Sequence, residues 1–106
     1  MTQDMLEKYP MWFCYAIYDY SGAPKLERAL MDFAKENFRF ALFDEDAIGH
    51  DCVERLQARA DRLLKENPRW KPVTVRLIKN DLVDGHWTVH FGNMILKLQK
   101  VNHYYE

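Results

Sequence analysis

The sequence predicts a two-layer α/β sandwich of α+β character, in which two main helices cover one face of a mixed sheet of about five strands. Three observations predict it. Apolar runs rich in aromatic and β-branched residues, at 11–20 and 38–43, are typical of buried strands. Apolar positions then repeat at helical spacing after Pro24 and after Asp51. The last third of the chain alternates apolar and polar side chains, as strands with one wet face do.

The composition indicates a globular protein. The chain has 106 residues, of which 48% are hydrophobic and 14% aromatic. A chain of this length supports one hydrophobic core, so we expect residues 1–106 to form a single domain. No apolar run approaches the ~20 residues of a membrane-spanning helix, and the first ten residues lack the pattern of a signal peptide. We therefore expect a cytoplasmic protein that does not associate with membranes.

The first half of the chain is predicted to be a βαβ unit. The strand at 11–20 ends at SGAP, where Pro24 suits the first turn of a helix that Asn37 is expected to end. Residues 38–43 then form a second buried strand. A helical connection of this length predicts that the two strands are parallel, with a right-handed crossover.

A second helix is predicted after the acidic segment FDEDAIGH. Asp51 and Glu54 have the spacing of a capping box, and the helix must end before Pro68. With a short N-terminal helix and three further strands, the order of elements is (α)βαβαβββ.

A hairpin is predicted at residues 85–101. If Gly92 and Asn93 form a two-residue turn, three pairs of apolar side chains share one face of the hairpin. These pairs are Phe91 with Met94, Val89 with Leu96, and Trp87 with Leu98. Because a shift of one residue would mix the two faces, the pattern favours this register.

The two cysteines, Cys14 and Cys52, are predicted to be buried free thiols, because their spacing matches neither a zinc knuckle nor a redox pair. The charges are unevenly distributed. Residues 1–53 carry ten acids and five bases, whereas residues 54–106 carry six acids and ten bases. Such a dipolar surface can attract a charged partner or a second copy of the chain.

Acidic residues supply one candidate catalytic site. If the strands at 11–20 and 38–43 are parallel, their carboxyl ends bring Asp19 close to Asp44, with Asp46 just beyond. A magnesium ion could bind there through one or two carboxylates. The same acids are also explained as loop charges and as residues that favour the start of a helix.

The segments AIYDY and FALFDED, separated by a helix, resemble the first half of the small ferredoxin-like nucleases of CRISPR adaptation systems. In that family an aspartate ends the first strand, a position that Asp19 matches. The resemblance implies a divalent-metal-dependent nuclease. It covers about thirty residues, and the chain departs from the family by entering its second helix without a preceding hairpin.

Two histidines, His86 and His90, share the spacing of a helical metal motif but fall on a predicted strand. At a rise of ~3.3 Å per residue they would lie roughly 13 Å apart, too far to share one ion. We predict no metal site and no cofactor.

Basic residues supply the preferred candidate, a binding surface. They form a stripe on the second helix and a group on the outward sheet face, the latter including the two histidines: Arg55, Arg59 and Arg62, and Arg76, His86, His90 and Lys97. No catalytic motif is present, so we favour a non-enzymatic, inhibitor- or adaptor-like binding and regulatory module over the nuclease. Its partner would be a protein or a nucleic acid. The two helices can cover only one face of the strand at 11–20. Because its other face is also apolar, we predict that a second copy of the chain packs against it in a homodimer.

Overall fold

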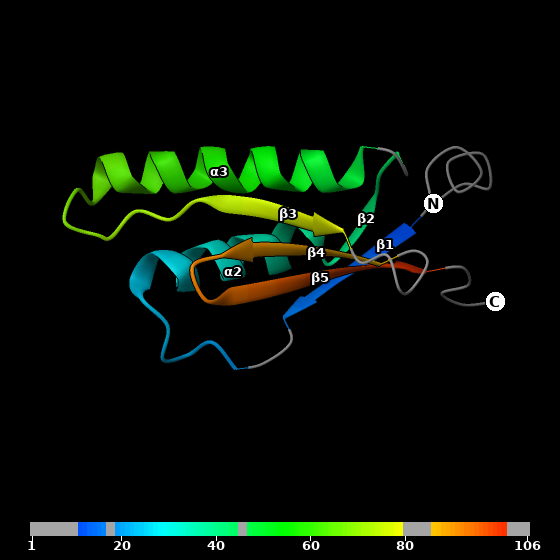
Figure 1. The fold of residues 1–106 in the computed structure, drawn as a ribbon, viewed down its shortest axis with the longest axis horizontal. Helices are drawn as coiled ribbons and strands as arrows, with labels where there is room; N and C mark the ends of the chain where they lie inside the picture. Colours follow the sequence, from blue (N-terminus) through cyan, green and yellow to red (C-terminus); the bar gives the residue numbers. More distant parts are fainter. Residues whose placement is uncertain (1–10, 17–18, 45–46, 80–85, 102–106) are drawn as a thin grey trace.

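The computed structural model of the protein describes residues 11–16, 19–44, 47–79 and 86–101. In chain order the elements are β1 (Met11–Ala16), α2 (Lys25–Phe38), β2 (Phe40–Leu42), α3 (Ile48–Glu66), β3 (Val75–Lys79), β4 (His86–Phe91) and β5 (Met94–Val101). Figure 1 shows the two helices packed beside the sheet. A mixed helix and strand architecture with two main helices is therefore confirmed. The short helix expected before β1 falls in residues 1–10, outside the described residues.

The strands lie in the order β2-β1-β5-β4-β3, and every neighbouring pair is antiparallel. The four longer strands form the body of the sheet, and β2 adds three residues at the edge beside β1. The prediction that β1 and β2 are parallel, which made the sheet mixed, is wrong. Only Arg39 separates α2 from β2, whereas αβ loops usually have about 2–6 residues. With no loop to reverse the chain, β2 continues in the direction of α2 and runs antiparallel to β1.

The β4–β5 hairpin has the predicted register. All three predicted apolar pairs are observed: Phe91 with Met94, Val89 with Leu96, and Trp87 with Leu98. Gly92 and Asn93 form the turn, and Gly92 has a φ of 61°. This left-handed conformation is one that glycine adopts without steric cost.

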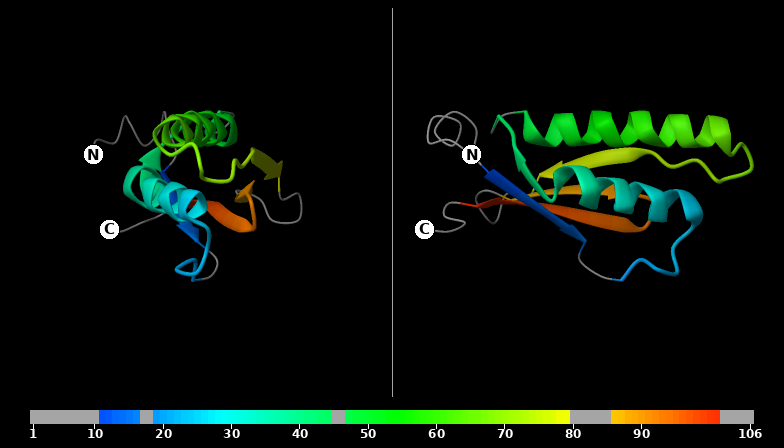
Figure 2. Two further views of the ribbon diagram at one scale, coloured as in Figure 1. Left: turned by 90° about the vertical axis from the view of Figure 1, so that its left-hand side faces the viewer. Right: turned by 180° about the vertical axis from the view of Figure 1, so that it is seen from behind.

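The core lies between the sheet and the two helices. α2 packs against β1, and α3 packs against β3 and β4, so that both helices cover the same face of the sheet (Figure 2). Alternate strand residues point into this layer. The largest side chains that are completely buried there come from both layers: Trp12, Leu30, Phe38, Leu56, Phe91 and Leu96. None of the helices in the described ranges is long and apolar enough to cross a membrane.

The start of α3 differs from the prediction. The helix begins at Ile48, not after Asp51, and its N-cap residue, Ala47, makes no side-chain cap bond. The backbone carbonyl of Asp44 accepts hydrogen bonds from the N–H groups of Ala47 and Ile48, at 3.1 and 3.0 Å. These two backbone bonds close the first turn. Asp51 lies within that turn, where a carboxylate interacts favourably with the helix dipole.

Gly92→Ala is expected to lower the free energy of unfolding by about 2 kcal/mol, because a side chain disfavours the left-handed backbone and a buried clash adds to that cost. A Cβ at Gly92 would lie 2.7 Å from Oε2 of Glu27, whose side chain is only 6% exposed. The control is Gly22→Ala, since a Cβ at Gly22 meets nothing within 4 Å. Urea denaturation measures both changes. Equal stability of the two variants would contradict the expectation.

Candidate binding surface on the sheet

The sheet side opposite the helices, called the open face below, carries the predicted sheet residues. It consists of Phe40 from β2, Phe13 and Tyr15 from β1, Ile95, Lys97 and Gln99 from β5, His86, Thr88 and His90 from β4, and Arg76 and Ile78 from β3. All of these side chains are half-buried or exposed. The register sets Arg76 directly beside His90 and Lys97 beside Tyr15. The sheet residues chosen from the sequence therefore lie on one surface.

The charged side chains of the described strands are all positive. No aspartate or glutamate occurs in any of the described strands, whereas these strands contain four lysines and arginines. On the open face, Arg76 and Lys97 form no ion pair with another described residue. The carboxylates of the described residues lie on the helices and loops. The open face is therefore a positively charged patch on a chain whose net charge is −1.

Three aromatic rings gather at the β1–β2 edge of the open face. The ring of Phe13 is stacked on that of Tyr15, with centroids 5.2 Å apart and planes 23° from parallel. Its centroid lies 5.0 Å from that of Phe40. Phe40 is 56% exposed, and the guanidinium carbon of Arg39 lies 5.9 Å from its centroid. The result is a row of three rings that is exposed at Phe40, half-buried at Phe13 and Tyr15, and has a cation at its end.

The sequence identified part of this row. One face of the first strand was expected to lack a cover, and the structure shows that this face carries Phe13 and Tyr15, while Trp12 and Cys14 point into the core. Phe40 was missed because residues 38–43 were interpreted as a strand buried on both sides. The sequence offered no signal for its exposure, because phenylalanine stands alike at positions 38, 40 and 43.

The arginine stripe on α3 is largely engaged within the protein. The guanidinium of Arg55 lies 4.8 Å from the ring centroid of Phe38, and that of Arg59 lies 5.4 Å from the ring centroid of Phe33. Both arginines therefore cover aromatic rings of α2 and contribute to helix packing. Arg62 forms an exposed ion pair with Glu66, with a distance of 3.7 Å between Nε and Oε2. Compared with the open face, this stripe is the weaker candidate for a binding surface.

The acidic candidates do not form one site. Because β1 and β2 are antiparallel, with Met11 opposite Leu42, Asp44 follows the strand pair at one end and Asp19 at the other. The convergence expected of Asp19 and Asp44 is therefore wrong. Asp46 lies outside the described residues. The carboxylate of Asp19 accepts hydrogen bonds from the N–H and hydroxyl of Ser21, at 3.0 and 3.1 Å, and so stabilises a local turn.

The histidines lie on the open face and not on a helix. His86 and His90 are both half-buried on β4. Nδ1 of His86 is buried and has no hydrogen-bond partner among the described residues. Within the described ranges, no group of three or more histidines, cysteines, aspartates or glutamates is placed to hold a metal ion.

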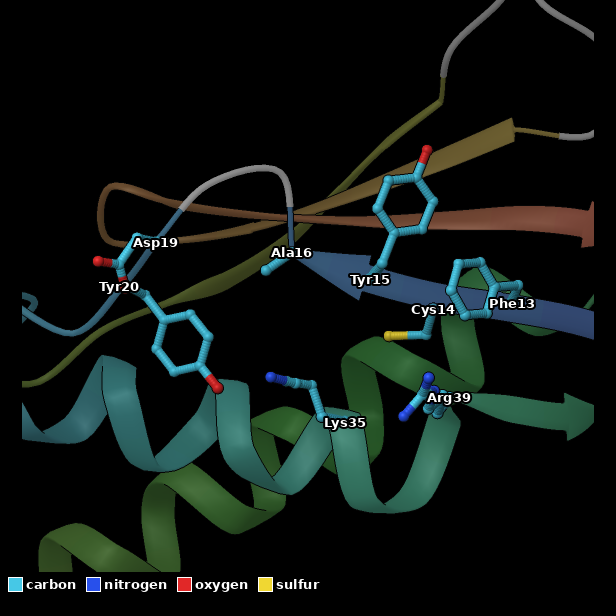
Figure 3. Close-up of a pocket in the computed structure, with 8 residues that line it drawn as sticks. All are labelled: Phe13, Cys14, Tyr15, Ala16, Asp19, Tyr20, Lys35 and Arg39. Atoms are coloured by element: carbon cyan, nitrogen blue, oxygen red, sulfur yellow. The ribbon is translucent and has the colours of Figure 1, made fainter.

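A pocket of about 420 Å³ adjoins the aromatic row where β2 ends and the edge of β1 becomes free (Figure 3). The backbone N–H of Cys14 donates to the carbonyl of Arg39 at 3.1 Å, and β1 continues past this bond. Figure 3 shows Phe13 and Tyr15 on the strand side of the pocket, with Lys35 and Arg39 on the helix side. Two cations, and Asp19 on the loop, therefore line a hollow beside exposed rings.

Tyr20 closes the far wall of this pocket. Its hydroxyl donates a hydrogen bond of 2.6 Å to Oδ1 of Asp32, and Nζ of Lys35 lies 5.4 Å from the centre of its ring. Desolvation and the bond to Asp32 raise the pKa of Tyr20 to about 12. The tyrosine therefore remains a neutral donor at physiological pH, and Lys35 is the charged group on this wall.

No family model matches the chain, and no significant match was found among curated proteins or solved structures. The function is therefore inferred from the geometry of the site alone.

Proposed function

We propose that the protein is a small, non-enzymatic binding and regulatory module, and that its open face contacts an acidic macromolecular partner. The observation that carries the proposal is the absence of carboxylates from the described strands, together with Arg76 and Lys97 on the open face. A patch of one sign attracts a partner of the opposite sign and repels others. An inhibitor or adaptor needs such a surface and no catalytic group.

A second copy of the chain competes as the occupant of this face. Exposed Phe40 and Ile78, the latter 42% exposed, favour a homodimer formed face to face. Electrostatic repulsion opposes such a dimer, because the positive charges of Arg76 and Lys97 on one copy would approach those on the other. The described strands contain no carboxylate that could pair with these charges. We therefore assign the open face to a different, acidic molecule. A cytoplasmic location accords with two cysteines that are buried and free.

Charge reversal on the open face is expected to weaken binding to heparin, a general polyanion, by about tenfold. Each exposed ion pair contributes roughly 0.2–1 kcal/mol, and reversal replaces attraction by repulsion. The variant is Arg76→Glu with Lys97→Glu, and its affinity for fluorescent heparin is measured at low ionic strength. The matched control, Arg62→Glu with Lys65→Glu, makes the same change of charge on α3, away from the open face.

The control is expected to retain wild-type affinity within about twofold. Light scattering on the free protein should report a monomer. Equal losses in the two double variants, or a dimer that disappears in Phe40→Ala, would contradict the proposed assignment of the open face.

A further inference from the structure

We infer that the acidic partner is single-stranded RNA, whose unpaired bases stack on the row formed by Phe13, Tyr15 and Phe40. The inference rests on the proposed function and names the partner class of the same face. It depends on three features that occur together: exposed rings, cations on both sides of them, and neutral hydrogen-bonding side chains on the neighbouring strands.

The rings lie against one another at distances at which aromatic groups interact. Successive centroids are separated by 5.2 and 5.0 Å, so the three side chains form one continuous apolar surface. Phe40 is 56% exposed, and Phe13 and Tyr15 are half-buried. Phe13 lies between Tyr15 and Phe40, so a base would extend this stack at its outer rings, Tyr15 and Phe40, and any base can do so because every base has a π-face.

Cations flank the row on both sides. Lys97 lies beside Tyr15 on the neighbouring strand β5. On the opposite side, Lys35 and Arg39 line the pocket that Phe13 and Tyr15 also line. Neither Lys35 nor Arg39 forms an ion pair with another described residue. A strand whose bases cover the rings therefore has cations within reach of its phosphates on either side.

This combination favours a single strand over a duplex or an acidic protein. A duplex keeps its bases stacked on one another, so it would use the cations and leave the rings uncovered. An acidic peptide would likewise pair with Lys97 and Arg39 without a need for three adjacent aromatic rings. Only an unpaired strand offers flat aromatic groups and a regular negative charge in one molecule.

Neutral polar side chains direct the assignment to RNA. Thr88 lies directly beside Lys97, and Gln99 lies directly beside Phe13. Both can donate and accept hydrogen bonds. Stacking and phosphate contacts are the same in DNA and RNA, whereas the 2′-hydroxyl is present only in RNA and is itself a donor and an acceptor. Side chains of this kind beside the rings favour the ribose.

The test is fluorescence anisotropy with labelled oligouridine of about twelve nucleotides, an unstructured single strand. Phe13→Leu and Phe40→Leu keep an apolar side chain but remove the ring, and each is expected to weaken binding between about 5- and 150-fold. Phe40→Tyr keeps the ring and is expected to bind within about twofold of wild type. Lys65→Gln removes a cation from α3, away from the open face, and serves as the control, with no change expected.

Two further measurements separate the contribution of phosphate contacts from that of contacts to the ribose. Three cations near the row, Lys97, Lys35 and Arg39, predict that log K falls with log salt with a slope of about −2, and Lys97→Gln should reduce the slope by about 0.7. Deoxyoligouridine of the same length is expected to bind at least about threefold more weakly than the RNA, since one hydrogen bond is lost. Circular dichroism establishes that each variant is folded.

The outcomes distinguish this inference from the function on which it rests. If heparin binds through Arg76 and Lys97 while the leucine variants bind oligouridine as wild type does, the RNA assignment is overturned and the binding module stands. Equal binding of RNA and DNA, or tighter binding of a duplex, also overturns it. If the protein binds neither heparin nor oligouridine, the proposed function fails as well.

Discussion

Replacing Trp12 with alanine is expected to lower the free energy of unfolding by about 3–5 kcal/mol, a large part of the stability of a domain of this size. The indole of Trp12 is 0% exposed, and Trp12 belongs to the core cluster formed by both helices and the sheet. Removal of the indole leaves a cavity in the core beside β1, the strand that carries Phe13 and Tyr15 on its opposite face. Urea denaturation followed by circular dichroism measures the loss.

Two matched variants test the cause of that loss. Phe40→Ala removes an aromatic side chain that is 56% exposed, and it is expected to change the stability by less than about 1 kcal/mol. Trp12→Phe keeps a buried aromatic ring and removes an indole N–H that is buried and has no hydrogen-bond partner in the described part of the chain. It should therefore cost clearly less than Trp12→Ala. A loss at Phe40 as large as that at Trp12 would contradict this account of the core.

Stability is expected to fall steeply between pH 9 and pH 12. Burial, with a smaller contribution from Cys52, raises the pKa of the Cys14 thiol from 9.0 to about 12. Burial also raises the pKa of Cys52 from 9.0 to about 12, although Arg55 opposes the shift. The thiols of the unfolded chain ionise near their ordinary pKa, so each thiol stabilises the folded state fully below pH 9. This contribution is lost as the pH rises towards 12, at about 1.4 kcal/mol per pH unit and thiol.

The double variant Cys14→Ala with Cys52→Ala isolates this effect. At pH 7 it should be less stable than wild type, because two buried sulfur atoms are lost from the core. Between pH 9 and pH 12, however, its stability should decrease more slowly, since tyrosines and lysines titrate in both proteins and only the thiols differ. Urea denaturation across this range gives the two curves. Parallel curves would show that the thiols do not cause the alkaline loss.

Local patterns in the sequence predicted the hairpin, whereas the pairing of β1 with β2 depended on a detail that no local pattern reveals. Gly92 and Asn93 specify a turn, and the alternating side chains beside them specify a register. The direction of β2 instead follows from the single residue, Arg39, that separates it from α2. Asn37 was expected to end the helix, which extends to Phe38. An error of one residue at that boundary hides the absence of a loop.

The candidate site was predictable to a similar degree. Alternation placed His86, His90 and Lys97 on the outward side of their strands, since side-chain direction along a strand has a period of two. Helical spacing placed Arg55 and Arg59 on the polar side of their helix, and the structure leaves Arg55 exposed and Arg59 half-buried. Spacing alone did not predict that both guanidinium groups also lie over rings of α2. The aromatic row needed the antiparallel pairing of β1 with β2, which the sequence did not predict.

The short connection between α2 and β2 also determines how Phe40 is held. Phe38 is 1% exposed, with its ring edge-on to Phe33 at 5.9 Å and to Phe43 at 6.1 Å. Phe40 follows two residues later on a paired strand, so its backbone is fixed by the same packing that fixes Phe38. A side chain on a flexible loop would lose conformational entropy when a partner binds it. The backbone of Phe40 has already lost that freedom on folding, so a molecule that binds this edge of the open face would meet an ordered backbone there.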